Sequence, residues 1–343
     1  MPAGETYNRS DARAWAHENY VGACDVILPS FKSDLSGLNE AGIRHDVRRN
    51  MELGFWGALL VSECGTTPDE MRQFMEIAVD EAGGEHYFML HGAFDTANDI
   101  IKMTKDAEAI GVDGMLLGHP NSFYPQSPKD ILDYTHYICS NVDIGVTLFA
   151  AHHFNFDRVD VSGYPTEVMV EAAKTEENVV AVKYEVGRPG VVGTYECFKA
   201  LAGTGVLVSD PFEPSCPLWT ELFDMPWMGT SNYEYWGDRI PKMLDAFNNG
   251  RREEGMEIYW QIQPARTTRL ATQATFGGAN FIHRYLWKYQ AWLNGFNGGP
   301  LRQPAMKLSD PLMARVKDGL KKAGLPHDVE STPADYFASR NPA

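Results

Sequence analysis

Lys183 lies in an apolar run, Val-Val-Ala-Val-Lys-Tyr-Glu, that extends from Val179 to Glu185. Apolar surroundings disfavour the ammonium form of lysine and lower its pKa, which leaves a free amine able to attack a carbonyl carbon and form a Schiff base. Glu185 follows two residues later and would face the same side of a strand, where its carboxylate could tune the amine or act as a base. The alternative is a strand-end lysine whose stem packs while its head reaches water, with Glu185 as a solvated carboxylate.

Four histidines each follow an apolar run that is expected to be a strand: His91, His119, His152 and His153. If the strands are parallel neighbours in one sheet, these side chains lie at the same rim. Imidazole exchanges protons near neutral pH, so His119 or His152 could shuttle protons while His91 and His153 contact a substrate. Each histidine alone is equally compatible with a hydrogen-bonded loop residue.

Carboxylates near the same rim leave a second chemistry open. Three histidines together with Glu63 or Asp210 would suit a divalent metal, because imidazole nitrogens and one carboxylate are common ligands of zinc or iron. The histidines lack the close spacing of established metal motifs, and a lysine amine beside a dication would be an unfavourable neighbour. We therefore expect no bound metal and assign Asp210 to the substrate.

The elements that must position these residues repeat along the chain. Eight short apolar runs alternate with amphipathic stretches bounded by Gly, Pro, Asn and Asp, which is typical of successive βα units. The runs are Cys24–Pro29, Gly57–Val61, Tyr87–Leu90, Gly114–Leu117, Gly145–Phe149, Val179–Lys183, Val206–Ser209 and Trp227–Gly229, and helices are expected at Thr67–Ala82, Thr96–Ile110 and Pro165–Lys174. The pattern predicts a (β/α)8 barrel, whose active site lies at the carboxyl ends of the strands.

After Asp238 the strand pattern ends, and helices are expected at Arg239–Asn248, Glu253–Thr272, Gly278–Asn294 and Pro311–Ala323. We therefore divide the chain into a barrel of residues 1–238 and a helical extension of residues 239–343. Tyr233 belongs to an aromatic group that follows the eighth run. This group could line a pocket for a bulky or aromatic substrate, or pack in the core.

Composition excludes several classes of partner. The 343 residues include 46 acidic and 30 basic side chains, a formal charge of −16, so attraction to nucleic acid or to anionic lipid is not expected. The five cysteines are widely spaced without a CxxC pair, as expected for thiols in a reducing compartment. No stretch has the length of a membrane span, and the amino terminus lacks the features of a signal peptide. We expect a cytoplasmic protein.

The βα repeats, the lysine on the sixth strand and the helical tail together resemble the dihydrodipicolinate synthase and N-acetylneuraminate lyase family of class I aldolases. Within it, the branch of benzylidenepyruvate hydratase-aldolases is most similar, through Val-Ile-Leu-Pro-Ser-Phe (26–31), Ser-Glu-Cys-Gly-Thr-Thr (62–67), Gly-Met-Leu-Leu-Gly-His-Pro (114–120), Phe-Asn-Phe-Asp (154–157) and Trp-Leu-Asn-Gly-Phe-Asn-Gly-Gly-Pro (292–300). The resemblance spans nearly the whole chain. It implies that Lys183 is the Schiff-base lysine, that no cofactor is needed and that the chain forms a homodimer or homotetramer.

Departures from the family pattern fall in the site itself. Family members carry a proton-relaying tyrosine at the end of the fifth strand, where this chain has Phe149. They also hold the substrate carboxylate with a Gly-Thr-Thr-Gly-type loop after the second strand, and here that loop is altered, leaving Glu63 and Thr66 as its candidates for substrate contact. Tyr124 matches a family loop tyrosine that reaches a neighbouring subunit's site, so it could replace the missing relay.

The sequence thus predicts an aldolase-type, Schiff-base-forming lyase that acts on a small carbonyl compound. Two other classes of function stay open at this point. One is a metal-dependent hydrolase or lyase that uses the histidine rim, and the other is a non-catalytic ligand-binding barrel.

Overall fold

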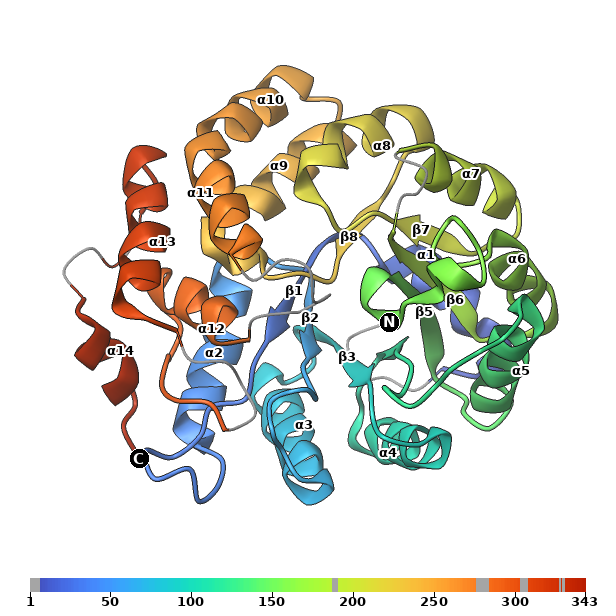
Figure 1. Ribbon diagram of the computed structural model, residues 1–343, viewed down its shortest axis with the longest axis horizontal. Coiled ribbons are helices and arrows are strands. Elements are labelled where there is room, and N and C mark those ends of the chain that lie inside the picture. The colour runs from blue at the N-terminus through green and yellow to red at the C-terminus, as the bar shows by residue number, and fades with distance from the viewer. Residues whose placement is uncertain (1–6, 187–190, 276–283, 303–307, 327, 329–330) are drawn as a thin grey trace. The chain divides into compact units, whose positions relative to one another are not determined.

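The structure is a computed structural model that describes residues 7–186, 191–275, 284–302, 308–326, 328 and 331–343 (Figure 1). Its strands are parallel and alternate with helices, so the predicted (β/α)8 barrel is confirmed. The strands are β1 (Gly22–Ile27), β2 (Gly57–Leu60), β3 (Tyr87–Gly92), β4 (Gly114–Leu117), β5 (Gly145–Ala151), β6 (Val179–Glu185), β7 (Leu207–Ser209) and β8 (Trp227–Gly229). All eight coincide with the predicted apolar runs, with differences of one or two residues at their ends.

The chain divides into two compact units. The first comprises residues 1–21 and 87–229, and the second comprises residues 22–86 and 230–343. The division proposed from the sequence, at residue 238, remains a prediction.

The first unit contains β3 to β8 and the helices between them. These helices are α1 (Ala12–Asn19), α4 (Ala97–Ile110), α5 (Pro128–Cys139), α6 (Thr166–Thr175), α7 (Val191–Leu201) and α8 (Cys216–Phe223), together with the short 3₁₀ segments η1 (Arg9–Asp11), η2 (His152–Phe154), η3 (Phe156–Arg158) and η4 (Glu213–Ser215). Strands β4 to β7 are buried along their whole length except at Glu185, as expected for parallel strands covered on both faces.

Strand register sets the heights of the side chains at the carboxyl ends of β5, β6 and β7. Phe149 on β5 is level with Lys183 on β6, and Ala151 is level with Glu185. On the other side of β6, Lys183 is level with Ser209 of β7. Strands β5 and β6 extend two residues beyond their predicted ends, and this extension places Glu185 on the strand rather than in a loop.

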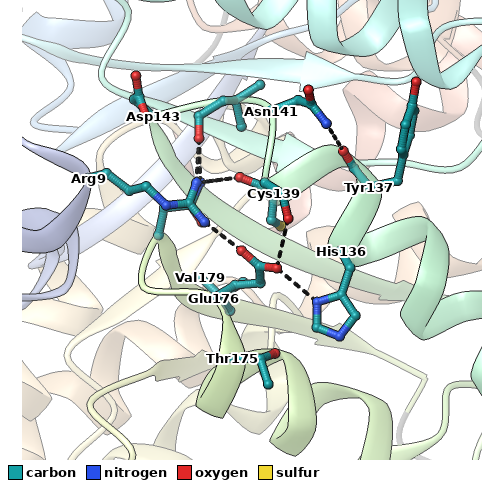
Figure 2. A network of polar contacts seen from close by, with 12 residues as sticks. Arg9, His136, Tyr137, Cys139, Asn141, Asp143, Thr175, Glu176 and Val179 are labelled. Carbon is teal, nitrogen blue, oxygen red and sulfur yellow. Dashed lines mark hydrogen bonds and ion pairs between the residues drawn. The ribbon is translucent and has the colours of Figure 1, made fainter.

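Arg9 connects the amino-terminal segment to the rest of the first unit (Figure 2). The Arg9 guanidinium donates to the carbonyl oxygens of Cys139 and Val142, the latter at 2.6 Å, and pairs with Glu176 at 2.5 Å. Glu176 also accepts from His136 Nδ1 at 2.9 Å. Nearby, Arg13 of α1 donates to the carbonyl oxygens of Val179, Ala173 and Glu176. These two arginines therefore donate to backbone carbonyls at and just beyond the carboxyl ends of α5 and α6, where helical carbonyls lack partners within the helix.

The second unit contains β1 and β2, paired in parallel, and helices from both ends of the chain. The helices are α2 (Glu40–Glu52), α3 (Pro68–Ala82), α9 (Arg239–Asn248), α10 (Arg252–Gln261), α11 (Gln263–Ala274), α12 (Arg284–Leu293), α13 (Asp310–Lys322) and α14 (Pro333–Ala338), with the 3₁₀ segment η5 (Tyr233–Trp236). Helix α3 begins as the sequence indicates, because Thr67 and Glu70 form a capping box and Pro68 occupies the first turn.

One predicted helix is wrong. The expected helix Glu253–Thr272 is two helices, α10 and α11, which meet at Ile262. Pro264 lacks the N–H that a continuous helix would need at this position, so it lies in the first turn of a new helix instead. Part of the expected helix Gly278–Asn294 lies outside the described residues, and α12 accounts for the rest.

None of the helices in the described part of the chain is both long enough and apolar enough to cross a bilayer.

Candidate functional site

Lys183 and Glu185 form a close pair at the end of β6. Lys183 Nζ lies 3.0 Å from Glu185 Oε2, and the lysine side chain is 6% exposed whereas that of Glu185 is 28% exposed. Both side chains therefore lie on the same face of β6, as strand alternation predicts. The amine also lies 4.1 Å from the centre of the Phe149 ring, on the neighbouring strand. Lys183 is buried as predicted, but its immediate surroundings combine one aromatic face with one carboxylate rather than being purely apolar.

Asp210 follows β7 and is 4% exposed. Burial raises the pKa of its carboxyl to about 6, and the negative charge of Glu185 adds to this increase. Two donors oppose it, the Phe212 N–H at 2.9 Å and the Trp219 indole N–H at 2.6 Å. Asp210 is thus an anchored carboxyl that is electrostatically linked to Glu185 and that titrates close to neutral pH.

His119 is enclosed by aromatic rings after β4. Its ring centre lies between 4.6 and 6.0 Å from those of five rings, which belong to Phe123, Tyr134, Phe154, Phe156 and Tyr164. Burial lowers the pKa of His119 to about 3, and the neighbouring His153 contributes to the decrease. The imidazole is therefore neutral at pH 7. These surroundings disfavour the imidazolium form, because they cannot solvate the cation, and the predicted part of His119 in proton transfer stays a prediction.

His152 and His153 begin the short η2 segment immediately after β5. The His153 ring contacts Phe149, with 5.4 Å between ring centres, and Phe154, with 4.2 Å. Phe154 in turn contacts Phe149 at 5.4 Å. The ring that supports the Lys183 amine is therefore itself flanked by two rings from η2. His91, near the end of β3, is 3% exposed.

Tyr124 is the most exposed of the predicted site residues, at 71%. Its ring is covered on one face by the Arg158 guanidinium, 3.5 Å from the ring centre, and Arg158 also donates to the Pro125 carbonyl. Within one chain Tyr124 is a surface residue. Its predicted role, which requires a neighbouring subunit, stays a prediction.

The remaining predicted residues, Glu63, Thr66 and Tyr233, lie in the second unit. Glu63 pairs with Arg284 of α12, and the Thr66 hydroxyl donates to the Ser62 carbonyl at 3.4 Å. Arg302 donates to the Gly65 carbonyl at 3.1 Å. The altered loop after β2 is therefore braced by arginine side chains.

Sequence reasoning missed two buried cations on α12, Arg284 and Lys288. Lys288 is fully enclosed and donates to the Pro29 carbonyl at 2.6 Å and the Ser30 hydroxyl at 3.1 Å. Burial lowers the pKa of Lys288, and the nearby Asp46 opposes this. Their spacing of four residues on a helix rich in aromatic and aliphatic residues, which begins Arg-Tyr-Leu-Trp-Lys, was the signal that could have revealed them.

Tyr233 is fully buried, and its backbone N–H donates to Asp25 of β1 at 2.9 Å. Asp25 also accepts from Asn50 at 2.7 Å and lies against Glu234, whose side chain is equally buried. Burial, reinforced in Glu234 by the charge of Asp25, raises the pKa of both carboxyls. The aromatic residues of η5 therefore cover a buried carboxyl pair, and their packing in the core is what the structure favours.

The metal alternative gains no support from geometry. In the described ranges, no three histidine, cysteine or carboxylate side chains come together in a way that could hold a metal ion. Glu63 belongs to the second compact unit, whereas the four histidines and Asp210 belong to the first.

Known proteins resemble this chain over most of its length. No family model matches it. The 4-hydroxy-tetrahydrodipicolinate synthase of Methanopyrus kandleri is 23% identical over 310 residues, which cover 89% of this chain and 96% of that protein. The corresponding synthase of Methanosarcina barkeri is 26% identical over 313 residues, covering 89% of this chain and 99% of the relative. The similarity supports the predicted relationship to the dihydrodipicolinate synthase and N-acetylneuraminate lyase family.

Solved structures of this family share the fold. The crystal structure of dihydrodipicolinate synthase from Aquifex aeolicus superposes with a TM-score of 0.75 and 18% sequence identity, covering 90% of this chain and all of that one. The 4-hydroxy-tetrahydrodipicolinate synthases that resemble the chain support the expectation of an aldolase-type carbon–carbon lyase. The benzylidenepyruvate branch stays a prediction, as does the interpretation of Phe149, which lies beside Lys183, as a departure from the family pattern.

Proposed function

We propose that this chain is a Schiff-base-forming lyase of the aldolase type in which Lys183 is the nucleophile. The observation that carries the proposal is the environment of its amine, which is buried on a barrel strand, 3.0 Å from a carboxylate and 4.1 Å from the centre of an aromatic ring. A carboxylate can accept the proton that the amine must lose before it attacks a carbonyl. The amine then becomes an iminium, which draws electrons from a neighbouring carbon–carbon bond.

The rings around the amine support a bulky or aromatic carbonyl substrate. Phe149, His153 and Phe154 contact one another with ring centres 4.2 to 5.4 Å apart, and Phe149 is in contact with the amine. Aromatic rings stack favourably with aromatic ligands, in offset or edge-to-face arrangements. We therefore assign the reaction to cleavage or formation of a carbon–carbon bond next to an aryl group, with or without an accompanying hydration step, as in the hydratase-aldolase branch.

The same proposal includes the cofactor requirement, the cellular location and the oligomeric state. The chemistry needs no external cofactor, because the lysine supplies the electron sink. We propose a cytoplasmic enzyme that forms a homodimer or homotetramer, in which Tyr124 contacts the neighbouring subunit.

Trapping the covalent intermediate tests the proposal. The protein is incubated with pyruvate and, separately, with benzaldehyde, reduced with borohydride and analysed by intact-mass spectrometry and peptide mapping. We expect an added mass on Lys183 that Lys183→Ala abolishes. Lys199→Ala, on the exposed surface of α7, is the matched control and should retain the adduct. An adduct that persists in Lys183→Ala, or an added mass on another lysine alone, would refute the assignment.

A further inference from the structure

The role of Lys183 as a nucleophile does not by itself identify the group that accepts and returns its proton. The family resemblance implies a proton-relaying tyrosine where this chain has Phe149, whose ring cannot exchange protons and lies 4.1 Å from the Lys183 amine. His119, one of the predicted substitutes, is enclosed by aromatic rings that disfavour its charged form. We propose that Glu185 is the catalytic acid–base residue of Lys183, taking the proton of the ammonium and returning it to the oxygen that leaves as water. This inference rests on the proposed function.

Contact and exposure both fit this role. Glu185 Oε2 is within hydrogen-bonding distance of Lys183 Nζ, at 3.0 Å, so a proton can pass directly between them. The glutamate side chain is 28% exposed whereas that of the lysine is 6% exposed. Glu185 can therefore exchange protons with solvent on behalf of an amine that is almost fully enclosed.

Several groups from the adjoining elements lie close to this pair. On β5, Phe149 and Ala151 are level with Lys183 and Glu185, and neither carries an ionisable side chain. After β7, the Asp210 carboxyl is committed to the Trp219 indole and the Phe212 N–H. His153 of η2 lies against the Phe149 ring. Asp210 and Glu185 interact through their charges, so Asp210 acts on the pair electrostatically.

The proton balance closes with one carboxylate. Glu185 takes a proton from the Lys183 ammonium, and the free amine attacks the carbonyl carbon, forming a C–N bond as the C=O π bond opens. A proton moves from nitrogen to oxygen to give the carbinolamine. Glu185 then donates its proton to the hydroxyl, the C–O bond breaks, water leaves and the iminium forms. Glu185 ends as a carboxylate beside the cationic nitrogen, as it began.

If Glu185 only tunes the charge of the Lys183 amine, replacing it should change the rate of Schiff-base formation in the opposite direction from a role in proton transfer. If the carboxylate only held the ammonium by charge attraction, Glu185→Gln would favour the uncharged amine and speed Schiff-base formation. If it carries protons, Glu185→Gln slows that step by about 100-fold or more, the usual contribution of general acid–base catalysis. The direction of the change therefore separates the two roles.

The experiment measures the rate of imine formation at pH 7 with pyruvate and with benzaldehyde, by rapid mixing, borohydride quench and intact-mass spectrometry. We expect the rate of imine formation to fall about 100-fold in Glu185→Gln and to be partly retained in Glu185→Asp. In Glu185→Ala, added formate should restore the rate in proportion to its concentration. Glu171→Gln, an exposed carboxylate on α6, is the matched control and should match the wild type. Circular dichroism verifies that each variant is folded.

Failures of the two proposals are distinguishable. Wild-type protein without an adduct on Lys183 would overturn the proposed function and this inference together. An adduct that forms in Glu185→Gln at the wild-type rate or faster, or a folded Glu185→Ala that formate does not restore, would overturn the role of Glu185 and leave Lys183 as the nucleophile.

Discussion

Replacing Arg9 by alanine should destabilise the protein substantially, although Arg9 lies near the amino terminus. The substitution removes a charged pair with Glu176, whose side chain is 8% exposed, and two hydrogen bonds to backbone carbonyls. Other contacts partly offset this loss of stability. Glu176 keeps its hydrogen bonds from His136 and from the Ser140 hydroxyl at 3.1 Å, and Asn178 still donates to both carbonyls.

The magnitude follows from these contacts. Losing a charge-assisted bond to a buried carboxylate costs about 2 kcal/mol, and two carbonyl bonds that retain a second donor add about 0.5 kcal/mol each. We therefore expect Arg9→Ala to lower the free energy of unfolding by about 3 kcal/mol, at the lower end of the range for breaking a buried ion pair.

Urea denaturation followed by circular dichroism measures this change as a shift of the midpoint at constant slope. Lys129→Ala is the matched control, because its ion pair with Asp133 is exposed and should contribute less than about 0.5 kcal/mol. A double-mutant cycle with Glu176→Gln should show a coupling of about 1 to 2 kcal/mol. The reasoning is refuted if Arg9→Ala costs no more than Lys129→Ala, or if the two substitutions are additive.

Two further predictions concern carboxyl groups outside the Lys183 pair. The pKa values of Asp25 and Glu234 are raised in the folded state, so the stability they contribute is present below the ordinary carboxyl range near pH 4 and is lost as pH rises. Glu234→Gln removes a carboxyl that the folded state favours in its protonated form, so we expect its stability relative to wild type to increase as pH rises above the ordinary carboxyl range in urea melts. Parallel pH–stability curves of the two proteins would contradict this. Trp219→Phe removes the indole donor that favours ionised Asp210, so the pKa of Asp210 should rise above its value of about 6. A carboxyl NMR titration measures this change. An unchanged or lower pKa would show that the hydrogen bond does not stabilise the ionised form.

The order of the elements could be predicted from the sequence because local patterns determine it. Each strand is a short apolar run bounded by turn-forming residues, and Thr67 with Glu70 marks the start of α3 by a capping box that needs no tertiary contact. The single helix expected across Ile262 was wrong because Pro264 has no N–H to continue the helix and instead lies in the first turn of α11.

Functional groups were predictable only in part. Lys183 could be found because a cation inside an apolar run conflicts with its local surroundings. Arg284 and Lys288 were missed because a charged residue on a helix usually faces water, and only packing of α12 against the loop after β2 and the segment after β1 shows that these two are buried.

The sequence by itself determined the alternation of strands and helices and the location of Lys183 on the sixth strand, since both depend on residues close together in the chain. Only the tertiary structure decided what surrounds that lysine. Strand register brought the Phe149 ring beneath the amine, and the extension of β6 carried the Glu185 carboxylate to its side. Aromatic rings from separate segments of the chain enclosed His119 and lowered its pKa. The reason is that the protonation of a side chain depends on the solvation and charges around it, and those come from residues that are distant in sequence.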